Sequence, residues 1–501
     1  MRLTLLRTLA TGWRWLSPLF LLSGLLGFGW ASPANAALNR YCQQDQSEID
    51  RKETLRQAVL LGEDGAIARY EELIKRHASD LQNCRRSGWP QKQATWLRLY
   101  PCDLQPGMLD ALMDRIINLG YNEVYIEAFY NGQVLLPVAD NNTAWPSVVQ
   151  SRGYENRDLL AEAIAAARHR GIEVSAWVFT LNFGYSYGQR ADRQQVLARN
   201  GQGVDTQTFA LNGQGNNPEE IFVDPYNEQA QRDYLQMLQA VLRRQPDSVL
   251  FDYIRYPRGV GAASVVSSVG DLWIYGTAAQ QALVQRALNN KGRELIRRFI
   301  YQGYITVNDV EQVDELFPTE GEPMWQSRRP AETPDEPSSA AVRRPVLQEE
   351  LWRFSVAHAI QGVVDFLQLA ARVTQQQNVS AGAVFFPSGN QVVGQQGYDS
   401  RLQHWDRFPQ SITWHPMAYS ICGNASCIVR DVQAVLEKTN SISNVRPALA
   451  GIWGSAINNR PSLEAQMAAL QSAAPGLRSI SHFAYSWQDP EFDRVRKFCQ
   501  L

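Results

Sequence analysis

Short apolar runs alternate along the chain with longer segments in which apolar residues recur every three or four positions. The short runs are rich in β-branched and aromatic residues and predict strands. They lie at 94–100, 122–130, 172–182, 248–257, 380–387, 412–420, 445–453 and 477–487. Each is followed by a helical pattern, such as the one that starts near Pro106 and ends at Gly120; after the fifth run the pattern is a short helix, at 401–408. Eight such units predict an α/β fold with parallel strands, a closed TIM-type (β/α)8 barrel. An open doubly wound sheet is the competing architecture, although no GxGxxG motif follows the first strand to favour a dinucleotide fold.

Two helical regions interrupt or precede this alternation. A charged, amphipathic stretch at 47–86, broken at Gly62, predicts an N-terminal helical hairpin. After the fourth strand comes an insertion with two helical patterns and a Pro-, Glu- and Ser-rich link, at 277–303, 306–317 and 328–345. We expect the link to be extended or disordered. The predicted domains are a signal peptide at 1–36, a helical extension at 37–90, and a barrel at 91–501 that carries the insertion at 259–345.

The first residues have the pattern of an export signal. A positive region is followed by an apolar run at 16–30 that is short for a membrane span. The positive residues are Arg2, Arg7 and Arg14. The sequence ANA at 34–36 then matches a signal-peptidase site. We therefore expect cleavage after Ala36, a periplasmic or extracellular protein, and no stable membrane span afterwards; an uncleaved membrane anchor is the alternative.

The six cysteines are even in number, which in an exported chain predicts disulfides. The short loop CGNASC predicts the pair Cys422–Cys427, and the open ends of the helical hairpin predict Cys42–Cys84. This leaves Cys102, just after the first strand, and Cys499, in the last helix. Because the first and eighth strands adjoin in a closed barrel, that pair would fasten the closure.

Composition excludes several classes of function. The chain has 501 residues and a formal net charge of -2, so it lacks the basic surface of a nucleic-acid-binding protein. There is no HExxH, P-loop or GxSxG motif, no CxxC pair, and no His partner for a cysteine at zinc spacing. We expect no metal, no cofactor and no nucleic-acid partner, and the pattern does not predict an oligomeric state.

The fourth predicted strand ends in a carboxylate. The buried run Val249, Leu250, Phe251 is followed directly by Asp252. In a parallel barrel, functional side chains lie at the carboxyl ends of the strands, so Asp252 is the first candidate for a catalytic residue. The alternative is an ion pair between Asp252 and Arg255 that closes the barrel rim.

Aromatic and amide side chains follow other strands at the same end. The candidates for substrate binding are Asn182, Tyr253, Arg255, His415, Tyr419, Trp453 and Trp487. Sugars have apolar ring faces and polar edges, which such side chains suit. Each ring taken alone fits core packing equally well, and His415 precedes a proline, which also fits a rigid rim.

Cleavage of a glycosidic bond normally takes two carboxyl groups. Glu127, at the end of the second strand between apolar neighbours, is the candidate for the second, because burial raises a carboxyl pKa toward that of a general acid. A buried, ion-paired barrel residue is the alternative for Glu127. Asp224 and Asp489 each precede a proline that opens a helix, so N-capping explains them without chemistry.

The segment FDYIRYP at 251–257 follows FVDPYNEQAQRDYLQ, with VYIEAFYNGQVLLP upstream and ITWHPMAYS downstream. In these motifs the chain resembles the family-10-like glycosyl hydrolases, exported proteins distinct from the family 10 xylanases, over roughly 94–487. The resemblance implies a TIM-type barrel and glycosidase activity, and Asp252 falls on the family's strand-four aspartate. Some members are similar to enzymes that cut peptidoglycan glycan strands stripped of their peptides. Many members have another residue in place of Glu127, and the insertion at 259–345 is not part of the common pattern.

Two hypotheses of function follow. The first is an exported glycoside hydrolase that acts on cell-wall peptidoglycan glycan strands or another extracellular polysaccharide. The second is a non-catalytic glycan-binding barrel of the cell envelope.

Overall fold

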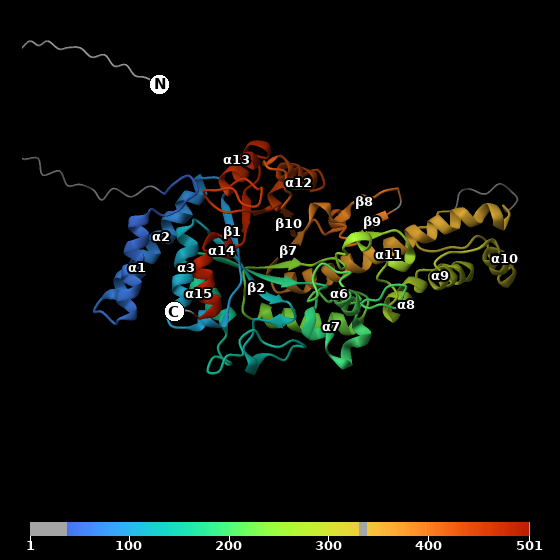
Figure 1. Cartoon of the computed structure of the whole chain (residues 1–501), viewed down its shortest axis with the longest axis horizontal. Coiled ribbons are helices and arrows are strands. Elements are labelled where there is room, and N and C mark those ends of the chain that lie inside the picture. Colours follow the sequence, from blue (N-terminus) through green and yellow to red (C-terminus); the bar gives the residue numbers. More distant parts are fainter. Residues whose placement is uncertain (1–37, 330–337, 396, 500–501) are drawn as a thin grey trace, which may run out of the picture. The chain divides into compact units, whose positions relative to one another are not determined.

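The computed structural model describes residues 38–329, 338–395 and 397–499 (Figure 1). The predicted signal peptide at 1–36 lies outside the described residues. So does the middle of the Pro-rich link, at 330–337.

Eight parallel strands form a closed barrel. The barrel strands are β1 (Lys92–Leu97), β2 (Glu123–Tyr130), β4 (Glu173–Phe179), β5 (Ser248–Asp252), β7 (Ser380–Phe385), β10 (Thr413–Ala418), β11 (Ala448–Ala450) and β12 (Ser479–Phe483). Around the barrel their order is β1, β12, β11, β10, β7, β5, β4, β2, and β2 pairs with β1 to close the ring. The predicted TIM-type (β/α)8 barrel is therefore confirmed, and the open doubly wound sheet is excluded.

Side chains alternate between the barrel interior and the surrounding helices, because successive residues of a strand point to opposite faces. Tyr125 of β2 makes edge contacts with Trp96 of β1 and His415 of β10, which lie on different sides of the ring. Tyr125 therefore points inward. Two residues further along β2, Glu127 shares that inward face and lies one layer closer to the carboxyl end of the barrel.

Helices cover the outside of the barrel (Figure 1). They are α3 (Met108–Asn118), α4 (Leu159–Arg168), α5 (Gly184–Gly188), α6 (Thr206–Leu211), α7 (Glu228–Leu242), α11 (Ala340–Gln376), α12 (Ser426–Leu436), α13 (Leu463–Ala473), α14 (Tyr485–Gln488) and α15 (Pro490–Phe498). By length and composition α11 could cross a membrane, but 72% of its most apolar window is buried in the fold, as expected of a core helix.

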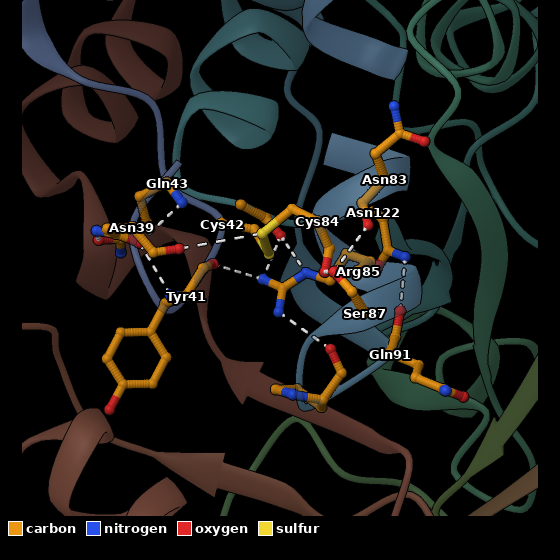
Figure 2. Close-up of a disulfide and its surroundings, with 12 residues drawn as sticks. Asn39, Tyr41, Cys42, Gln43, Asn83, Cys84, Arg85, Ser87, Gln91 and Asn122 are labelled. Carbon is orange, nitrogen blue, oxygen red and sulfur yellow. Dashed lines mark hydrogen bonds between the residues drawn. A yellow bond between two sulfur atoms is a disulfide. The ribbon is translucent and has the colours of Figure 1, made fainter. Parts of the chain in front are cut away.

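The N-terminal hairpin consists of α1 (Gln46–Leu60) and α2 (Ala66–Ser87). The disulfide Cys42–Cys84 joins its open ends, and Arg85 beside it is almost fully buried (Figure 2). The Arg85 guanidinium donates to the carbonyl oxygens of Gly120, just before β2, and of Tyr41, at 2.6 and 2.7 Å. Burial lowers the pKa of Arg85 to about 10. These bonds fasten the hairpin to the amino end of the barrel.

Two more disulfides join the pairs expected from the sequence, Cys102–Cys499 and Cys422–Cys427. The first links the segment after β1 to the end of α15, across 397 residues of chain. It therefore fastens the first and last strand–helix units, which adjoin in the closed ring.

The insertion after β5 carries three helices, α8 (Thr277–Gln285), α9 (Asn290–Gln302) and α10 (Val307–Leu316). The expectation of an extended link up to 345 is wrong at its carboxyl end, because α11 already begins at Ala340 and contains Pro345. Arg343 pairs there with Asp314 of α10 and with Glu322, which holds this first part of α11 against the insertion.

The segment after β7 lacks the short helix expected at 401–408. Residues 401–408 form one 3-10 turn, Trp405–Arg407, and another such turn, Pro387–Asn390, directly follows β7. Three short strands, one of them from the insertion, pair in a separate antiparallel sheet, with β9 between the other two. These are β6 (Val265–Val266), β8 (Val392–Val393) and β9 (Gly397–Asp399), and a further short strand, β3 (Gln133–Val134), pairs antiparallel with the end of β2. The sheet joins the insertion to the loop after β7.

Candidate active site

Asp252 is the last residue of β5, lies opposite Phe179 of β4, and is 6% exposed. The Trp177 indole nitrogen donates to its Oδ2 at 3.1 Å, and the Tyr253 amide donates to its Oδ1 at 2.6 Å. Burial raises the pKa of Asp252 to about 6; the Tyr253 amide, the Arg255 charge and Trp177 oppose this rise, and the charge of Glu127 adds to it. Asp252 is thus a carboxyl group that titrates close to neutral pH.

The chain turns sharply directly after this carboxylate. Tyr253 has a φ of +52°, in the left-handed region that costs a residue with a β-carbon about 1–2 kcal/mol. In this conformation the Tyr253 amide points back at Asp252 instead of continuing the ladder of β5. Strain of this kind is characteristic of residues held in place around functional sites.

Glu127 of β2 lies opposite Trp177 and is 1% exposed. Arg98, which follows β1, donates to its Oε2 at 2.5 Å and lies over the Tyr130 ring at 4.6 Å. Burial raises the pKa of Glu127, and the positive charge of Arg98 opposes that rise. The other oxygen, Oε1, has no hydrogen-bond partner within the described residues. Glu127 is therefore both the ion-paired barrel residue and the second carboxyl group at this end of the barrel.

The alternative ion pair between Asp252 and Arg255 is not formed, because the structure places both Arg255 and the Tyr253 hydroxyl against Glu220. The Arg255 guanidinium lies 3.4 Å from one Glu220 oxygen, and the Tyr253 hydroxyl donates to the other at 3.2 Å. Arg255 still lowers the pKa of Asp252 through its charge. Sequence reasoning missed Glu220, because it lies in a loop rather than at a strand end.

An aromatic wall adjoins Asp252, which accepts from one of its members, Trp177. Its members are Trp96, Trp177, Tyr419, Phe483 and Trp487. Phe483, the last residue of β12, touches the other four, with ring centroids 5.7 to 6.4 Å apart. Burial and the charge of Asp252 raise the pKa of Tyr419 well above its ordinary value, and its hydroxyl has no hydrogen-bond partner among the described residues. Of the predicted sugar-binding residues, Tyr419 and Trp487 therefore lie in one cluster with Asp252.

Three other predicted binding residues lie apart from the aromatic wall. Asn182 is fully buried and its Oδ1 accepts from the amides of Gly184 and Ile221, so it shapes a loop. His415 lies deeper inside the barrel against Thr413, and burial lowers its pKa far below the ordinary value, which keeps it uncharged.

Trp453 faces the N-terminal extension. Its indole donates to the Tyr121 hydroxyl at 3.2 Å and packs against Tyr41 and His482. Because β11 ends at Ala450, strand alternation no longer dictates the direction of Trp453, and we leave it out of the site proposed below.

The two aspartates expected to be caps do hold helix ends, one of them at a different helix. Asp489 caps α15, whereas Asn227 rather than Asp224 caps α7. Asp224 accepts from the amides of Tyr226 and Ala279, and the second bond caps α8 of the insertion. Burial raises the pKa of Asp224 to about 6 as well.

Among the described residues, no three His, Cys, Asp or Glu side chains are placed to hold a metal ion.

The chain matches no protein-family model and no curated protein sequence, so membership of the family-10-like glycosyl hydrolases stays a prediction. Among solved structures it is similar to the glycoside hydrolase domain of PgaB (BpsB) from Bordetella bronchiseptica, with 15% identity, a TM-score of 0.47, and 81% of this chain and 98% of that chain covered. It is also similar to a GH18 chitinase from Pseudoalteromonas aurantia, with 12% identity, a TM-score of 0.37 and coverage of 82% and 99%. A GH20 exo-β-N-acetylglucosaminidase from Vibrio harveyi has 8% identity, a TM-score of 0.40 and coverage of 81% and 55%. Similarity at this level assigns no role to any residue of this chain, so the chemistry must be argued from the barrel itself.

Proposed function

We propose that the protein is a glycoside hydrolase whose site lies at the carboxyl end of the barrel. One observation carries the proposal: two buried carboxyl groups meet there at Trp177, which lies in register with Glu127 and donates its indole N–H to Asp252. A pair of carboxyl groups is what glycosidic bond cleavage requires. Three rings of the aromatic wall are partly exposed, those of Tyr419, Phe483 and Trp487, and they supply the apolar surface that a sugar ring covers.

The environments of the two groups suggest different roles. Asp252 accepts hydrogen bonds from two uncharged donors and titrates near pH 6, so at neutral pH it is ionised and acts as nucleophile or base. Glu127 is the candidate general acid, because burial favours its protonated form. Tyr419 and Trp487 contact the sugar, while Arg255 and Tyr253 support the site through Glu220.

The substrate is proposed to be a peptidoglycan glycan strand or another extracellular polysaccharide, on the strength of the resemblance and of the predicted signal peptide. Three disulfides suit a protein that folds in an oxidising compartment, periplasmic or extracellular. N-terminal sequencing of the protein from the envelope fraction should begin at Ala37; an intact Met1 would point to the anchored form.

A non-catalytic glycan-binding barrel is the second candidate, and the Arg98–Glu127 ion pair is the observation that favours it. A carboxylate that keeps its charge beside a guanidinium is a poor proton donor. Release of reducing ends from peptide-free glycan strands, with unrelated polysaccharides as comparison, separates the two functions. A catalyst releases them, whereas a binding protein only retains the polymer.

The decisive variants are Asp252→Asn and Glu127→Gln, which keep shape and remove charge. Asp252→Asn should lower turnover by several orders of magnitude with little change in the thermal midpoint. Glu127→Gln should be partly relieved by substrates with good leaving groups, which need less acid assistance. Asp224→Asn is the matched control, since Asp224 is another buried carboxyl group with a raised pKa. Wild-type turnover in the first two variants, or a loss confined to Asp224→Asn, would show that the assignment is wrong.

A further inference from the structure

A basic cavity lies outside the barrel, between the insertion and α11. Its volume is about 480 Å³, and its lining comes from α8, the segment around Trp325, the middle of α11 and the turn that ends at Arg407. A second hollow of about 510 Å³ shares Arg286, Gln326 and Gln361 with it, so the two form one groove. In Figure 1, α8 to α10 gather along the first half of α11, to one side of the barrel strands.

The positive charge of this groove exceeds its negative charge. The arginines of the first cavity are Arg286, Arg328, Arg329, Arg353 and Arg407. Among its described lining residues Glu350 is the one carboxylate, and it is paired with Arg328 at 2.8 Å. Asp365 is the carboxylate of the adjoining hollow.

Arg353 is paired with Glu349, whereas Arg286, Arg329 and Arg407 have no carboxylate partner among the described residues. Arg286 reaches only uncharged partners, the Gln326 amide oxygen and the Tyr226 hydroxyl, both at the long distance of 3.4 Å. The side chain of Arg407 is exposed and forms no hydrogen bond or ion pair with any described residue. His358 adds no charge, because burial and Arg286 lower its pKa to about 3.

The remaining lining indicates a carbohydrate. Guanidinium groups bind carboxylate, sulfate and phosphate oxygens through paired N–H donors. The amides of Gln285, Gln326 and Gln361 add donors and acceptors suited to hydroxyl groups. Trp325 and Phe354 are buried, so little aromatic face is available for stacking on a neutral sugar. We propose that this groove is a second carbohydrate subsite, which binds the acidic groups of an anionic polysaccharide.

The groove is lined by segments that leave the carboxyl ends of two barrel strands. Arg286 and Arg328 belong to the segment that leaves the carboxyl end of β5, and Arg407 belongs to the one that leaves β7. Segments that leave carboxyl ends of parallel strands gather at the same face of a barrel. The inference rests on the proposed function in one respect: a polymer held by the groove is then presented to the carboxyl groups at the mouth.

Binding is tested on the full chain carrying Asp252→Asn, so that turnover does not consume the probe. The probes are a hexamer of galacturonic acid and the neutral hexamer of N-acetylglucosamine, measured by titration calorimetry at two salt concentrations. We expect the acidic hexamer to bind through the groove, with an affinity that falls as salt rises. Adding Arg286→Gln and Arg407→Gln should weaken its binding at least tenfold.

The control removes the same charge elsewhere, with Arg232→Gln and Arg297→Gln, both on exposed helix surfaces. Equal weakening in the control, or unchanged binding in the groove variant, would overturn the proposal. So would inorganic sulfate that binds as tightly as the hexamer, because the groove would then recognise an ion rather than a glycan. The proposed catalytic function is tested separately: it fails if the single Asp252→Asn variant keeps wild-type turnover. The binding measurements on the groove do not depend on that result.

Discussion

The hydrogen bond from Trp177 to Asp252 makes a quantitative prediction about the candidate active site. The indole nitrogen donates to Oδ2 at 3.1 Å and thereby favours the ionised carboxylate. Trp177→Phe removes this donor and keeps a ring that can still pack against Trp96 and Phe483. The pKa of Asp252, about 6 in the native protein, should therefore rise further.

The size of the rise follows from the strength of the lost bond. A hydrogen bond to a charged group contributes about 1.5–3 kcal/mol, and one pKa unit corresponds to about 1.36 kcal/mol. Water that enters the smaller side chain's site replaces part of the interaction. We expect an increase of about one unit, the lower end of this range. If Asp252 acts as nucleophile or base, the acidic limb of kcat/KM moves up by the same amount.

The pKa is measured without relying on activity, by carbon-13 NMR of aspartate carboxyl groups, with the Asp252 signal identified by its loss in Asp252→Asn. Trp405→Phe is the matched control, since Trp405 is buried and donates its indole N–H to the Pro387 carbonyl instead. An Asp252 pKa that is unchanged in folded Trp177→Phe would refute the reasoning.

Because the folded pKa exceeds the ordinary value of 3.8, the stability contribution of Asp252 is fully present below pH 3.8 and is lost as the pH rises through about 6. The dependence of the thermal midpoint on pH should be weaker in Asp252→Asn over that range.

Three other outcomes are expected. Arg98→Gln removes the positive partner of Glu127, so the pKa of that buried carboxyl group should rise, which carboxyl NMR of labelled glutamate would detect. Asp224→Ala removes the cap of α8 and should lower the free energy of unfolding by about 1–2 kcal/mol in a denaturant titration, with turnover on a small substrate unchanged. Replacing Cys102 and Cys499 by serine opens a loop of 397 residues and should lower the free energy of unfolding by roughly 4–6 kcal/mol in the chain-entropy model, again measured by denaturant titration.

The barrel could be predicted because its strands are buried on both faces. Such strands leave continuous apolar runs that helical patterns separate, and the rule that functional groups follow strand ends then selected Asp252. The same rule says little about Trp453, because β11 ends three residues earlier and its alternation no longer applies. The short helix expected at 401–408 has apolar spacing for one turn only, and the structure forms one turn.

The residues that sequence reasoning missed depend on pairing between distant segments. Arg98 reaches Glu127 only because Trp96 and Tyr125 are in register across β1 and β2. Glu220 lies in a loop and receives its partners from the turn after β5, 33 and 35 residues later in the chain. A side chain of this kind has no local pattern, since its role is set by the partner that the fold brings to it.

The two carboxyl groups therefore differ in the groups that hold them, and the rule that functional groups follow strand ends does not predict this difference. Asp252 is held by uncharged donors that the fold fixes, a buried indole and a strained backbone amide, so its protonation changes little with small movements. Glu127 is held by Arg98, whose side chain is 43% exposed at the mouth. A ligand that displaces this guanidinium removes the one charge that opposes burial, so the pKa of Glu127 rises when the site fills. Without a ligand, the Arg98–Glu127 ion pair favours a binding protein. If the ligand displaces Arg98, Glu127 becomes a general acid in the complex, so the ion pair is compatible with catalysis as well. Carboxyl NMR of Glu127 with and without a bound oligosaccharide distinguishes the two, because a merely structural ion pair keeps its pKa when the ligand binds.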